Sequence, residues 1–221
     1  AHTFMMRQTR RPVVGVVPFL RDLNLPEEDS VSFKAGDNQT RARRRDSVDI
    51  AVLDLPHISN FTDFDALRME PDVTLRIVRN VSSLGNPDAV IIPGSKNVPG
   101  DLQFLRTSGI ADALLRLAAR GRCRIVGICG GFQMLGESIA DPHRLESGTG
   151  GSFKGLGLLP VRTVLEQEKQ LSLTVATHCA SHDEVRGYEI HHGRTETGHG
   201  VSSLMQTSRG ETVAVGKKDE R

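Results

Sequence analysis

Short runs rich in Val and Ile alternate with helix-like segments from Ser47 onward, and this alternation restricts the possible fold more than any other feature. Four runs predict strands, at Val48–Leu53, Leu75–Arg79, Ala89–Ile92 and Arg124–Ile128. Helices are expected between them, at Thr62–Met69 and Asp101–Arg120. The pattern predicts an α/β fold with a mostly parallel central sheet and helices on both faces. The later segments LSLTVATHC, EVRGYEIHHGRTE and ETVAVG predict antiparallel strands added to that sheet in the C-terminal part.

The first 46 residues differ in character from the rest of the chain. RPVVGVVPFL, from Arg11 to Leu20, predicts a buried strand, and the polar, arginine-rich run that ends near Asp46 is typical of a linker. A charge run without interleaved aromatic residues usually forms a solvated surface, although these arginines could bind phosphate. We therefore expect an N-terminal strand and basic linker in residues 1–46 and one main domain in residues 47–221.

Composition excludes several classes of partner. The 28 Lys and Arg residues balance 27 Asp and Glu residues, so no overall field attracts nucleic acid or an anionic membrane. No apolar run approaches the length of a membrane span, and the N-terminus lacks the apolar core of a signal peptide, so a cytoplasmic location is expected. The cysteines Cys123, Cys129 and Cys179 are odd in number and lack metal-ligand spacing, which predicts neither a disulfide framework nor a metal site.

The stretch GICGGFQMLG places Cys129 between a predicted strand and a predicted helix. This is the context of a nucleophile elbow, with sulfur in place of the hydroxyl group. The backbone N–H of Gly130 would face a developing oxyanion, and Gly94 and Ser95, after another strand at the same sheet edge, could supply a second donor. The alternative is a structural cysteine in a tight turn, which is the interpretation we favour for Cys123 and Cys179.

Four motifs carry a family resemblance, in the order LPHISNFTDFDAL, VIIPGSKN, GICGGFQMLG and VRGYEIHHGRT. The chain resembles the glutaminase domain of cobyric acid synthase, a class I-like glutamine amidotransferase with a flavodoxin-like sheet, from roughly Arg11 to Thr195. The resemblance implies that Cys129 attacks the side-chain amide of glutamine, giving a thioester and ammonia. It also implies that Gly130, Gly94 and Ser95 are oxyanion donors and that Gln133 and His191 bind the substrate.

The resemblance further implies a partner for this domain. In the family, ammonia passes to an ATP-dependent synthetase domain, which amidates side chains of cobyrinic acid a,c-diamide in cobalamin biosynthesis. That domain, which would hold ATP and Mg, is absent from this sequence. We therefore expect glutamine as the substrate and no cofactor on this chain.

One departure from the family pattern concerns the general base. The family histidine lies in a motif close to GTYLHG, whereas this chain runs GETVAVGKKDER. His191 and His192 are candidates to replace it, but adjacent strand residues point to opposite faces, so at most one faces the site. His57 in LPHISN also matches a histidine of the family motif, and the sequence favours neither a structural nor a functional role for it.

Two hypotheses follow from this departure. The chain is either a glutaminase that supplies ammonia, slowed by the missing histidine, or a non-catalytic, truncated remnant that acts at most as a binding module. A related glutaminase subunit that amidates a cell-wall lipid precursor is disfavoured by LPHISNFTDFD.

Overall fold

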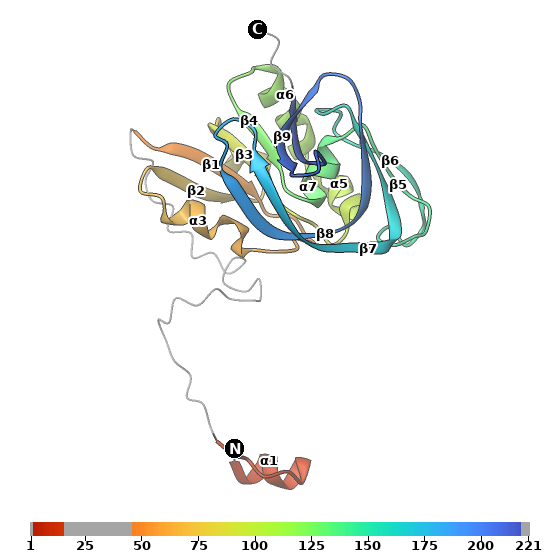
Figure 1. Cartoon of the computed structure of the whole chain (residues 1–221). Coiled ribbons are helices and arrows are strands. Elements are labelled where there is room, and N and C mark those ends of the chain that lie inside the picture. The colour runs from red at the N-terminus through yellow and green to blue at the C-terminus, as the bar shows by residue number, and fades with distance from the viewer. Residues whose placement is uncertain (1, 16–45, 218–221) are drawn as a thin grey trace.

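The first sheet is parallel and four-stranded. A computed structural model describes residues 2–15 and 46–217 (Figure 1). The sheet has the strand order β2-β1-β3-β4, with β1 at Val48–Leu53, β2 at Val73–Val78, β3 at Ala89–Ile92 and β4 at Arg124–Gly127. All of its pairings are parallel, which confirms the predicted α/β class. The consecutive residues 50–53 of β1 are all buried, which requires cover on both faces of the sheet.

Helical segments fill the connections between these strands. They are η1 (Thr62–Phe64), α3 (Asp65–Met69), α4 (Val81–Leu84), α5 (Val98–Thr107), α6 (Ile110–Ala119) and α7 (Gly130–Leu135). The single helix expected over Asp101–Arg120 is wrong, because Gly109 adopts a left-handed φ of 76° and separates α5 from α6. Helix α6 buries Ile110, Leu114 and Leu117, which lie one turn apart along one face.

The C-terminal half forms a second sheet. Its strands are β5 (Ser138–Asp141), β6 (Gly151–Lys154), β7 (Val161–His178), β8 (Glu184–Thr197), β9 (Val201–Thr207) and β10 (Thr212–Lys217). The order is β10-β9-β7-β5-β6, and β8 pairs with β7 as a long hairpin (Figure 1). Strands β7 to β10 pair antiparallel, as predicted, but they belong to a separate sheet, so the expectation that they are added to the parallel sheet is wrong. The chain turns into β5 soon after α7 and begins a separate sheet, in which β5 and β7 pair in parallel.

Helix α7 lies where the two sheets meet. It contacts β3 and β4 of the first sheet and β5 and β7 of the second. One continuous core of buried apolar side chains includes residues of both sheets, among them Val52, Ile92, Ile139 and Leu165. The residue at the start of α7, Cys129, is consequently placed at the junction of the sheets.

The N-terminal segment contains a helix that the sequence did not predict, α1 (His2–Thr9), whose described residues are exposed. Residues 11–15 form no regular element, so the strand expected from Arg11 is wrong in this part. Its remainder and the basic linker lie outside the described residues, and the domain boundary near residue 46 stays a prediction.

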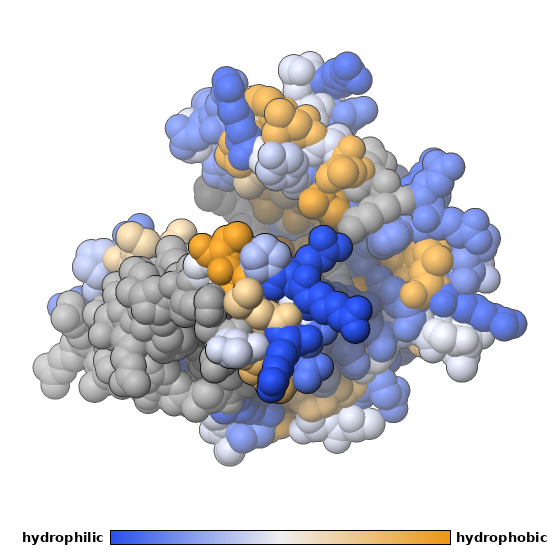
Figure 2. All heavy atoms as spheres, turned by 90° about the horizontal axis from the view of Figure 1, so that it is seen from below, coloured by the Kyte–Doolittle hydropathy of each residue, from blue (hydrophilic) through white to orange (hydrophobic). Residues whose placement is uncertain are grey.

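The surface of the described residues is mixed in character. Figure 2 shows one face, on which hydrophilic side chains gather near the centre and hydrophobic side chains lie in small separate groups. In the part of the chain that the structure describes, no helix is both long and apolar enough to cross a membrane.

Candidate active site

Cys129 occupies a strained turn between β4 and α7. Its backbone has φ 49° and ψ −109°, a conformation that residues other than glycine rarely adopt. Hydrogen bonds from Gly131 N to Ile128 O (2.8 Å) and from Gln133 N to Cys129 O (3.1 Å) hold the turn. The cysteine is exposed. Such strain, held by its surroundings at an exposed thiol, is the geometry of a nucleophile elbow.

The start of α7 packs directly on the end of β3, and glycine makes this contact possible. A Cβ atom at Gly131 would lie 2.0 Å from the carbonyl oxygen of Ile92. The helix is short, because it ends at Leu135 and Ser138 already belongs to β5. The close contact fixes Cys129 relative to the loop that follows β3.

That loop contains Gly94 and Ser95, which lie beside Cys129 at the carboxyl edge of the sheet, as the sequence predicted. A Cβ atom at Gly94 would be 3.8 Å from the Cβ of Cys129, and one at Gly130 would be 2.9 Å from Ser95 N. The Ser95 N–H donates to none of the described residues, and the Gly130 N–H is the first of its helix, where no intrahelical acceptor exists. Both N–H groups are thus available to an oxyanion near the sulfur.

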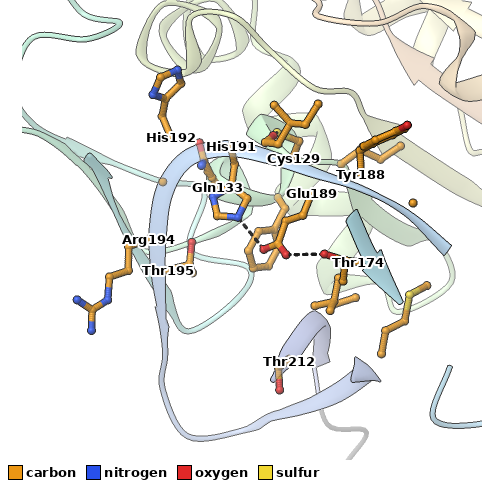
Figure 3. Close-up of a pocket in the computed structure, with 18 of the residues that line it drawn as sticks. Cys129, Gln133, Thr174, Tyr188, Glu189, His191, His192, Arg194, Thr195 and Thr212 are labelled. Carbon is orange, nitrogen blue, oxygen red and sulfur yellow. Dashed lines mark hydrogen bonds and ion pairs between the residues drawn. The ribbon is translucent and has the colours of Figure 1, made fainter. Parts of the chain in front are cut away.

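A cavity of about 750 Å³ opens beside Cys129 and is bounded mainly by the second sheet (Figure 3). Its lining includes Cys129, Gln133, Thr174, Glu189 and His191. Strand β8 passes over the thiol, since the Sγ of Cys129 lies 4.0 Å from the carbonyl oxygen of Ile190. The size is typical of a small-molecule site.

The polar wall of the cavity is a hydrogen-bonded pair of side chains on β8. The Nε2 of His191 lies 2.9 Å from Oε1 of Glu189, and the Thr174 hydroxyl donates to the same carboxylate at 3.1 Å (Figure 3). The hydrogen bond from His191 lowers the pKa of Glu189 more than burial raises it, and the bond from Thr174 lowers it further. The ring of His192 turns to the other side of the strand (Figure 3), as the alternation of side chains along a strand requires.

Gln133 forms part of the cavity floor, one helical turn beyond Cys129. It is buried, and β8 lies directly on it, because a Cβ atom at Gly193 would be 2.4 Å from Gln133 Nε2. Gln133 and His191 therefore border the same space as the thiol, and their role in binding the substrate stays a prediction.

The other two cysteines lie outside this cavity lining. Cys123 is buried in the core, and burial, with the negative charge of Asp88, raises its pKa and favours the thiol form. Cys179 is exposed just beyond the end of β7. His57, the remaining sequence candidate, lies next to the Gly94–Ser95 turn, where Lys96 N donates to its carbonyl oxygen at 2.8 Å.

Comparison with known proteins decides the family. Residues 49–220 match the CobB/CobQ-like glutamine amidotransferase domain. The chain belongs to this family. It is 47% identical to the adenosylcobalamin biosynthesis bifunctional protein CobDQ of Leptospira interrogans over 88% of this chain and 22% of that protein. It is 45% identical to the cobyric acid synthase of Nitratidesulfovibrio vulgaris over 93% of this chain and 44% of that protein. The glutamine amidotransferase domain thus spans less than half the length of these relatives.

Solved structures agree on the fold. The crystal structure of a glutamine amidotransferase superposes with a TM-score of 0.57 at 19% identity, covering 76% of this chain and 84% of that chain. The PurLQS structure from Thermotoga maritima gives a TM-score of 0.54 at 18% identity, covering 73% of this chain and 75% of that chain. These similarities confirm the class I-like fold of the glutamine amidotransferase domain.

Proposed function

We propose that this domain is the glutaminase part of a cobyric acid synthase, in which Cys129 hydrolyses glutamine and supplies ammonia for amidation in cobalamin biosynthesis. The observation that carries the proposal is the strained turn at Cys129, with Gly130 and the backbone nitrogen of Ser95 packed closely together beside it. The names of the two relatives support the pathway.

The proposed reaction uses the groups around the elbow in order. The Cys129 sulfur attacks the side-chain amide carbon of glutamine, and its proton ends on the leaving nitrogen. The N–H groups of Gly130 and the Gly94–Ser95 turn stabilise the oxyanion that forms. Expulsion of ammonia leaves a γ-glutamyl thioester. Water then attacks the thioester, which releases glutamate and returns a proton to the sulfur.

Gln133 and His191 are proposed to hold the glutamine side chain and backbone in the cavity. Gln133 is fixed beneath β8, and His191 is fixed by Glu189, so neither side chain must lose much freedom when substrate binds. Such a wall favours a polar amino acid over an apolar ligand, because its hydrogen-bonding groups would otherwise lose water without gaining a partner.

The proposed partner is an ATP-dependent synthetase part, which would hold ATP and Mg. The greater length of the relatives supports this partner. A surface feature supports it as well. Leu171 pairs with Ile190 and Leu173 with Tyr188 across the β7–β8 hairpin, so these four exposed apolar side chains share one face. An exposed apolar patch of this kind, on the hairpin that covers Cys129, is typical of a protein contact surface.

The test is covalent labelling by a diazo-ketone analogue of glutamine, followed by peptide mapping. We expect Cys129 to react first and excess glutamine to slow the reaction, while Cys123 and Cys179 serve as controls within the same chain. Label appearing first on either control cysteine would contradict the proposal. Saturable glutamine binding with no label on Cys129 would instead support the alternative, a non-catalytic binding module.

A further inference from the structure

Asp101 is a carboxylate in the first turn of α5 with no exposed surface. Burying an ionised group is costly unless hydrogen bonds compensate for the lost water. The usual reason for an acidic residue at this place is to accept the N–H groups at the helix start. In α5 two other side chains accept these N–H groups. Gly100 N donates to Asn97 Oδ1 at 2.9 Å, and Val98 N donates to Glu146 Oε2 at 2.7 Å.

The oxygens of Asp101 accept from two loops instead. The Ser95 hydroxyl donates to Oδ2 at 2.7 Å. On the other side, Oδ1 lies 2.8 Å from His57 Nδ1 and accepts from His57 N at 3.2 Å. One buried carboxylate therefore joins the turn after β3 to the loop after β1.

Further hydrogen bonds make the joined loops a single unit. Ser59 N donates to Gly94 O at 2.9 Å, and Asn97 N donates to the Ser95 Oγ at 2.9 Å. The Ser95 hydroxyl is thus used twice, because it accepts from Asn97 and donates to Asp101. The backbone nitrogen of Ser95 lies against the start of α7, because the Cβ of a residue at position 130 would be 2.9 Å from it.

We infer that Asp101 is a positioning residue for the oxyanion donor of Ser95, and that His57 is the second anchor of the same carboxylate. The inference rests on the proposed function, because it assigns Asp101 to the step in which the Ser95 N–H meets the oxyanion. Donors of this kind act only within a narrow range of distance, so the hydroxyl link sets how well the turn stabilises the transition state.

The variant Asp101→Asn separates positioning from packing. An amide of the same shape offers one acceptor oxygen where the carboxylate offers two, so either Ser95 or His57 loses its acceptor. Two thiol reagents report the result. The diazo-ketone analogue of glutamine places a carbonyl oxygen near the Ser95 N–H, whereas iodoacetamide alkylates the Cys129 sulfur by direct displacement and needs no oxyanion donor.

For Asp101→Asn we expect the maximal rate of diazo-ketone labelling to fall at least about tenfold, which is less than the about 10²–10³-fold known for complete loss of an oxyanion donor. The half-saturating concentration and the iodoacetamide rate should stay near the values of the unmodified chain. Ser95→Ala, which keeps the backbone N–H and loses the link to Asp101, should show the same selective loss. Asp54→Asn is the matched control, since the Asp54 carboxylate pairs with Arg79 at 2.8 Å and not with Ser95, His57 or Asp101.

Labelling by the diazo-ketone at the unmodified rate in Asp101→Asn, or equal slowing by both reagents, would overturn the inference. If Asp101→Asn does not fold, an unchanged Ser95→Ala overturns it. Failure of the proposed function is visible separately, as absence of diazo-ketone label on Cys129 in the unmodified chain. Amide hydrogen exchange then decides the positioning role: residues 94–97 should exchange faster in Ser95→Ala while α6 is unchanged, and equal exchange in both chains contradicts it.

Discussion

Gly131→Ala should disrupt the elbow in a way that the distances define. The added Cβ would lie 2.0 Å from the carbonyl oxygen of Ile92 and 2.7 Å from that of Pro93, and both neighbours are backbone atoms. Relief to an ordinary contact of 3.4 Å or more requires α7 and β3 to move apart. Overpacking of this kind should lower the free energy of unfolding by about 1–3 kcal/mol.

The functional effect of Gly131→Ala should exceed the effect on stability. Movement of α7 carries Cys129 away from the Gly94–Ser95 turn, and a displacement of about 1 Å can cost about 100-fold in rate. Urea unfolding gives the stability, and diazo-ketone labelling gives the rate. Gly187→Ala is the control, because a Cβ there has no heavy atom within 4 Å. If Gly131→Ala matches this control in both assays, the close contact between α7 and β3 does not hold the elbow in place.

Two further predictions concern stability. Burial raises the pKa of Asp141, but hydrogen bonds from the N–H groups of residues 145–147 and the Ser147 hydroxyl outweigh it and lower the pKa from 3.8 to about 2. This stabilisation is present above about pH 4 and is lost as the pH falls toward 2. Asp141→Asn should therefore lower the free energy of unfolding, measured with urea at pH 7, by about 2 kcal/mol, and should remove the loss of stability between about pH 4 and 2. The same loss of stability in acid in the variant as in the unmodified chain would contradict this prediction. Leu114→Ala in the core should lower the free energy of unfolding by about 2–5 kcal/mol in the same assay. Leu115→Ala, at the neighbouring exposed position, should lower it by less than about 1 kcal/mol, and equal losses would contradict the core assignment.

The parallel sheet could be predicted because its central strands β1 and β3 are buried on both faces and are therefore nearly continuous apolar runs, such as Ala89–Ile92. The proximity of Cys129 and Ser95 followed from one rule, that loops after parallel strands share an edge. The second sheet was harder to predict. In β7 the polar run EQEK interrupts the apolar alternation, and a register shift between Leu165 and Gln170 accompanies it.

The parts of the site that the sequence did not reveal depend on contacts between distant segments. Asp101 follows Ser95 by six residues, but its link to His57 spans 44 positions and has no sequence pattern. The sequence could have indicated Glu189 as a partner of His191, because it lies two residues before His191 in a predicted strand and its side chain is therefore on the same face. The break at Gly109 had a local signal, the Ser-Gly pair, which the leucine pattern of the flanking helices obscured.

The central claim is that Cys129 forms a γ-glutamyl thioester, and acid quenching of the chain with glutamine tests it most directly. Mass analysis of the peptide that contains Cys129 should show an added glutamyl group, formed together with released ammonia. Cys129→Ala should show neither the adduct nor the ammonia, while Cys123→Ala should show both. Ammonia release from Cys129→Ala at the rate of the unmodified chain would contradict the account.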